Sequence, residues 1–142
     1  MCIETPVQFQ PSLEMDEDNV RDFCRKVLTG QYKNIQDIIK SQENNLTKIN
    51  IERLNLHRGN FPTIIKGVCQ HLFSIRSSQP AYVIAVLGFA KIINEHYNSS
   101  TWYNQDLLID VLYDILKEAG VEPVYIIQYC NRQLSQRYCI II

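Results

Sequence analysis

Three aspartates with helical spacing form the most regular set of chemically reactive side chains in the sequence. Asp106, Asp110 and Asp114 recur at every fourth residue, so they would line up along one side of a helix. Carboxylates in that arrangement could bind a cation or carry out acid–base chemistry. They lie opposite a stripe of leucine, valine and isoleucine, however, and acidic side chains on such a face are normally solvated. We therefore predict a solvated face here and no metal site.

The thiols and imidazoles are scattered and do not form a recognisable catalytic or metal-binding motif. Cys69 and His71 are two residues apart, so on a helix they would point in different directions. The five cysteines have no C-x-x-C spacing, which favours free thiols in a reducing compartment. The sequence also has no Gly-rich phosphate loop, G-x-S-x-G elbow or H-E-x-x-H motif. We expect a protein that is not an enzyme and has no cofactor.

The last four residues match a lipidation pattern. Cys139 is followed by three isoleucines, and a cysteine, two aliphatic residues and a final residue make up the prenylation signal. Lipidation at Cys139 is therefore one hypothesis, and an apolar tail over 139–142 that packs on the protein is the other. A single lipid chain anchors weakly and reversibly, so we expect at most weak peripheral membrane association.

Composition and charge narrow the class of protein. The chain has 142 residues, which favours one domain over 1–142, and 46% of them are hydrophobic. The net charge is −1, and without a basic excess nucleic acid is disfavoured as a partner. Only five glycines and five prolines are present, which disfavours a turn-rich all-β protein.

Apolar periodicity predicts an all-α fold. Residues 1–15 hold two prolines and are expected to form an irregular arm. Amphipathic stripes with helical spacing then recur along the chain, whereas 49–56 is ambiguous between alternation and helix. Residues 81–90 are apolar on every side, which is typical of a buried helix. We predict a buried central helix over about 79–97, surrounded by five to six amphipathic helices.

Parts of the sequence resemble the Bcl-2 family of apoptosis regulators. The residues His71-Leu72-Phe73, followed by AYVIAVLGFA at 81–90, are similar to the BH1 region of that family. The sequence VEP at 121–123, followed by YIIQ at 125–128, is similar to the opening of its BH2 region, and 19–32 is similar to its first helix. The resemblance spans about two-thirds of the chain, by pattern more than by identity.

The departures from the family pattern affect the expected site. Where the family has Asn-Trp-Gly-Arg, this chain has Gln79-Pro80-Ala81-Tyr82, so Tyr82 replaces the arginine that pairs with the ligand's aspartate. The BH2 tryptophans and the family's C-terminal membrane span are missing as well. Short, divergent members with these losses resemble the viral Bcl-2 proteins of large DNA viruses such as iridoviruses and poxviruses.

The resemblance implies binding rather than catalysis. Its partner would be the amphipathic BH3 helix of a pro-apoptotic protein, laid in an apolar groove. Sequestering that helix would block mitochondrial apoptosis from the host cell cytoplasm, with association to mitochondria. Loss of the arginine removes a charge-assisted hydrogen bond, typically worth ~1.5–3 kcal/mol, which implies narrower partner choice or weaker binding. The matching positions are Val68, Leu72, Ala85 and Phe89 as groove-lining residues, His71, Gln79 and Tyr82 as rim groups, and Ala81 in place of the family's glycine.

Two further interpretations stay open. Some poxviral members of the same fold are signalling decoys, which block innate immune (NF-κB type) adaptors through a non-groove surface, often as a homodimer. A cellular helical adaptor or a prenylated peripheral protein is the third interpretation. An intact groove would favour BH3 binding, and a filled groove with an apolar patch elsewhere would favour the decoy.

Overall fold

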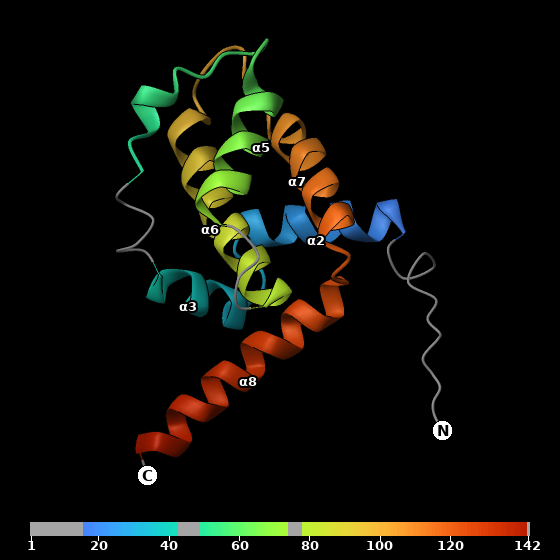
Figure 1. The fold of residues 1–142 in the computed structure, drawn as a ribbon, viewed down its shortest axis with the longest axis vertical. Helices are drawn as coiled ribbons and strands as arrows, with labels where there is room; N and C mark the ends of the chain where they lie inside the picture. Colours follow the sequence, from blue (N-terminus) through green and yellow to red (C-terminus); the bar gives the residue numbers. More distant parts are fainter. Residues whose placement is uncertain (1–15, 43–48, 74–77, 142) are drawn as a thin grey trace.

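The protein is an all-helical bundle. The computed structural model describes residues 16–42, 49–73 and 78–141, and every regular element within these ranges is helical (Figure 1). The ambiguous segment near residue 50 contains one turn of 3-10 helix, η1. The elements are α2 (Glu17–Leu28), α3 (Lys33–Ser41), η1 (Ile51–Leu54), α5 (Phe61–Leu72), α6 (Gln79–Tyr97), α7 (Gln105–Ala119) and α8 (Pro123–Ile141).

Local capping signals set several of the helix ends. The carboxylate of Asp16 accepts from the backbone N–H of Asn19 at 3.3 Å, and so satisfies a free donor at the start of α2. Ser78 caps α6 and Asn104 caps α7 in the same way, at 3.2 Å and 3.1 Å. Gly120 ends α7 with φ at +70°, a left-handed conformation that glycine adopts without strain. The observed bounds of α6 match the range of about 79–97 predicted for that helix.

Helix α6 contributes much of the described core. It packs against α2, α3, α7 and α8, and Figure 1 shows α2 passing across it while α8 runs below. Its first turns are less enclosed, because Gln79 is exposed and Ala81, Tyr82 and Ala85 are half-buried. The buried residues of this helix are Val83, Ile84, Val86, Leu87, Gly88, Phe89, Ala90 and Ile93.

Helix α5 buries only one side of its apolar stripe. Phe61, Ile65 and Cys69, each four residues apart, have at most 1% of their surface exposed. Ile64 and Val68 lie at the edge of that stripe and are only partly buried against the core. The helix with which α5 makes its most extensive contact is α7. The Ile64–Val68 edge therefore borders the surface instead of a second layer of helices.

The three aspartates of α7 are exposed, as predicted, but each also meets a cation from another helix. Asp110 accepts from Arg21 of α2, and the Arg21 guanidinium lies 5.1 Å from the centre of the Tyr113 ring. Asp106 lies 3.7 Å from Arg25, and Asp114 lies 3.1 Å from Lys66 of α5. Exposed pairs of this kind contribute only about 0–1 kcal/mol each. They favour one alignment of α2, α5 and α7 but do not drive folding.

We predict that Leu87→Ala lowers the free energy of unfolding by about 2–5 kcal/mol, because Leu87 is fully buried and its loss leaves a cavity. Urea unfolding followed by circular dichroism measures this change. The matched control is Glu95→Ala on the exposed side of the same helix, which is expected to change stability by less than about 0.5 kcal/mol. Equal effects of the two substitutions would contradict the packing described for α6.

Candidate functional site

An apolar hollow lies between η1 and the exposed edge of α5. It has a volume of about 410 Å³. Leu54, Ile64 and Val68 supply half-buried apolar surface, and Gly67, which has no side chain, lines the hollow beside them. The exposed residues Arg53, Thr63 and His71 supply its polar groups. A concave, mainly apolar surface with a few polar groups is the usual character of a binding site.

The α5 side of the hollow is built by helical spacing. Ile64, Gly67, Val68 and His71 follow one another at intervals of three, one and three residues, so they share one face over about two turns. Gly67 lies in the middle of this face, and a Cβ added there would meet no atom within 4 Å. The absence of a side chain at this position therefore keeps the hollow open.

The η1 side is held by a short network around an asparagine cap. The side-chain oxygen of Asn50 accepts from the backbone N–H groups of Glu52 and Arg53, at 3.1 Å and 3.4 Å. Asn55 then turns the chain in a left-handed conformation, with φ at 50°. Asn60 donates to the Asn55 carbonyl at 3.1 Å, which connects η1 to the start of α5. Arg53 and Leu54 are thereby held on a defined backbone.

The structure brings two of the expected groove residues together. Val68 and His71 both line the hollow, whereas its lining within the described residues comes from η1 and α5 and not from α6. The side chains of Leu72 and Cys139 lie outside the described part of the chain. The expected residues of α6, which are Gln79, Ala81, Tyr82, Ala85 and Phe89, lie on the helix as described above, away from this lining.

Tyr82 and Phe89 have surroundings of their own. Burial raises the pKa of the Tyr82 hydroxyl, and the Cys69 thiol and the Glu118 carboxylate raise it further. Tyr82 is partly buried and packs against the core. Phe89 is fully buried, and its ring centre lies 5.9 Å from that of Phe73. In this structure Phe89 contributes to the core.

Five lining residues were not predicted from the sequence. Ile64 belongs to an apolar stripe with helical spacing, and spacing alone does not divide such a stripe into a core side and a hollow side. The available signal was Gly67, a helix-weakening residue inside an apolar stripe. Leu54 and Arg53 carried no signal, because their segment was ambiguous. The five residues are Arg53, Leu54, Thr63, Ile64 and Gly67.

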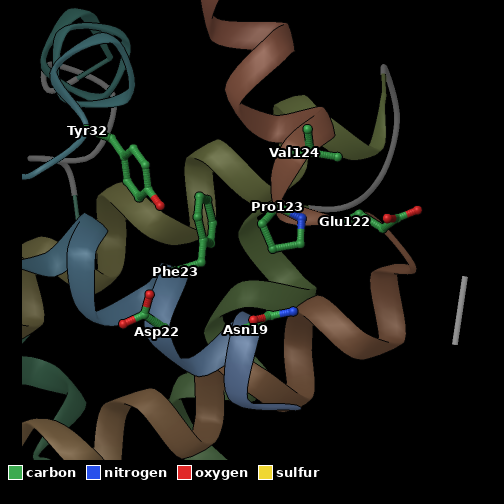
Figure 2. Close-up of a pocket in the computed structure, with 7 residues that line it drawn as sticks. All are labelled: Asn19, Asp22, Phe23, Tyr32, Glu122, Pro123 and Val124. Atoms are coloured by element: carbon green, nitrogen blue, oxygen red, sulfur yellow. The ribbon is translucent and has the colours of Figure 1, made fainter. Parts of the chain in front are cut away.

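A second hollow lies where α2 meets the start of α8. It also measures about 410 Å³, and Figure 2 shows Phe23 of α2 between Tyr32 and Pro123. The Phe23 and Tyr32 ring centres are 5.4 Å apart. Val124 is 48% exposed and the adjacent Tyr125 is 51% exposed, so an apolar patch adjoins this hollow. Figure 1 shows the start of α8 on the other side of the bundle from η1.

The described thiols are buried and unreactive in character. Cys24, Cys69 and Cys130 are free cysteines in the core. Burial raises the pKa of Cys24 and of Cys69 to about 12, so both thiols are neutral at pH 7. Within the described ranges, no group of three or more histidine, cysteine or acidic side chains could hold a metal ion. Nor does any helix in those ranges have the length and apolar character needed to span a membrane.

Comparison with known proteins adds no relative: no family model, curated protein or solved structure matches this chain.

We predict that stability falls with rising pH between about 9 and 12. The folded state keeps the Cys24 and Cys69 thiols neutral up to a pKa of about 12, whereas unfolded thiols ionise near 9. Stability should thus be unaffected by these groups below pH 9. Above it, each thiol should reduce the free energy of unfolding by up to ~1.4 kcal/mol per pH unit.

Urea unfolding under reducing conditions at pH 7, 9 and 10.5 measures this effect. The matched control is the double variant Cys24→Ala, Cys69→Ala, in which the loss should be smaller. It should not vanish, because burial also raises the pKa of Cys130 to about 12 and raises the pKa of Tyr103. Parallel pH profiles for the two proteins would show that the thiols do not cause the loss.

Proposed function

We propose that this chain is a Bcl-2-like bundle, with α6 as its buried central helix, that sequesters a BH3 helix in the hollow beside α5. The observation that carries the proposal is the apolar face of Ile64, Gly67 and Val68, which no described helix covers. An amphipathic helix presents an apolar ridge of similar spacing, and such ridges dock into apolar grooves. The burial of eight residues of α6 supports the fold part of the proposal.

The position of Tyr82 supports narrow partner choice. The family's arginine would reach from this position to an aspartate on the ligand. Here the phenol is half-buried and burial raises its pKa, so at neutral pH it offers no charge to a helix lying over α5. Affinity would come mainly from apolar contact along α5. In the host cell cytoplasm, this binding would hold a pro-apoptotic partner away from mitochondria and block apoptosis, the role performed by viral Bcl-2 proteins.

We predict that Gly67→Glu weakens the binding of BH3 peptides at least tenfold. The new side chain enters open space in the hollow, so it competes with the ligand without displacing a core residue. Calorimetric titration against a panel of BH3 peptides measures the affinity. Circular dichroism establishes that the variant is folded.

The matched control is Gly67→Ala, which adds only a methyl group. It should bind within about threefold of the original protein. It should also be more stable by about 1 kcal/mol, because alanine favours a helix over glycine. The proposal fails if no peptide binds the folded protein, or if Gly67→Glu binds as tightly as Gly67→Ala.

The exposed patch of Val124 and Tyr125 favours a second candidate function, the signalling decoy. Two large apolar side chains, each about half exposed, adjoin a hollow on a face distinct from the α5 hollow. Contiguous exposed apolar surface often marks a protein interface. On this alternative the patch would mediate a homodimer or contact an innate immune adaptor.

We predict, for this alternative, that the protein dimerises with increasing concentration and that Tyr125→Glu makes it monomeric. A charge placed in a buried apolar interface is strongly unfavourable. Sedimentation velocity measures the change. Gln70→Glu on α5 adds the same charge outside both hollows and should leave the dimer intact. A monomer at all concentrations would exclude dimerisation through this patch.

A further inference from the structure

The hollow beside α5 has a charge as well as an apolar floor. Arg53 is the one formally charged side chain among its seven lining residues. Arg53 is exposed and its backbone is fixed by the Asn50 cap. Arginine keeps its charge in proteins at all ordinary pH values. A ligand that covers the hollow must therefore lie against a permanent cation.

Arg53 also differs from the cations that form ion pairs in the described part of the chain. Arg21, Arg25, Lys26 and Lys66 each have a carboxylate within 4.0 Å. In the described part of the chain, by contrast, the guanidinium of Arg53 has no carboxylate within that distance. Because Arg53 is exposed, water solvates its charge, and a docked ligand would displace that water.

Removing water from an unpaired charge is costly unless the ligand supplies a counterion. A helix with an apolar ridge alone would cover the floor of the hollow but leave Arg53 unpaired. A helix with a lysine or arginine facing Arg53 would be repelled. A carboxylate facing Arg53 would accept a charge-assisted hydrogen bond from the guanidinium, in a geometry that allows two parallel bonds.

We infer that the helix bound beside α5 carries an acidic side chain that pairs with Arg53 of η1. This inference rests on the proposed function and names the chemistry of its partner. The cation for this contact comes from η1. In the Bcl-2 family it comes from the position that Tyr82 occupies on α6. The apolar ridge of the ligand would then supply most of the affinity, and the acidic residue would set register and choice of partner.

A charge exchange tests the pairing. The probe is the tightest-binding BH3 peptide of the panel, with each of its acidic residues changed singly to lysine. Arg53→Glu should weaken binding of the unmodified peptide at least tenfold. One lysine-substituted peptide should bind Arg53→Glu more tightly than it binds the original protein. Raising the salt concentration should weaken the original pair and have less effect on Arg53→Ala.

The matched control is Arg58→Glu, which changes the same charge on an exposed residue of the same loop, outside the lining of the hollow. It should alter binding less than threefold. If Gly67→Glu abolishes binding while Arg53→Glu and Arg58→Glu have equal effects, the inference is wrong and the groove proposal stands. If no peptide binds the folded protein, both are overturned.

Discussion

The packing of the apolar residues in the middle of α6 is the interaction on which the rest of the structure depends. This helix presents apolar residues on every side between Val83 and Ala90. Any orientation on the surface of a bundle would therefore expose some of them to water. Burying each of its large aliphatic side chains contributes about 1.5–3 kcal/mol. Four helices, α2, α3, α7 and α8, pack against it. Helix α5 packs mainly on α7 instead, and this leaves one edge of α5 free to line a hollow.

The polar contacts between helices have a smaller and different role. The pairs of Arg21 with Asp110 and of Lys66 with Asp114 cross between helices at the exposed rim of the bundle. Water and salt screen them, so together they contribute less than one buried leucine. Their contribution is to alignment: they fix how α2 and α5 lie along α7. The position of α5 in turn sets the distance between its exposed edge and η1, and so the width of the hollow.

The helices and their ends could be predicted from the sequence because their causes are local. Ser78, Asn104 and Gly120 act on residues within one turn, and spacing alone aligns an apolar stripe. The hollow depends on tertiary packing, which spacing does not encode. Ile64 and Ile65 are adjacent and chemically identical, yet one borders the hollow and the other is buried. The choice between them depends on where α7 lies, and the η1 wall depends on a cap by Asn50 in a segment with mixed periodicity.

In the proposed groove, the two sides of the hollow would make separate physical contributions to recognition. The α5 side offers apolar area with a gap at Gly67, and apolar contact is tolerant of which side chain makes it. The η1 side offers one fixed cation, and a cation discriminates sharply, because an unmatched charge is penalised when water leaves. Tyr82 is half-buried against the core and uncharged at neutral pH, so it adds to packing more than to ligand choice. A groove organised in this way would bind through α5 and select through Arg53.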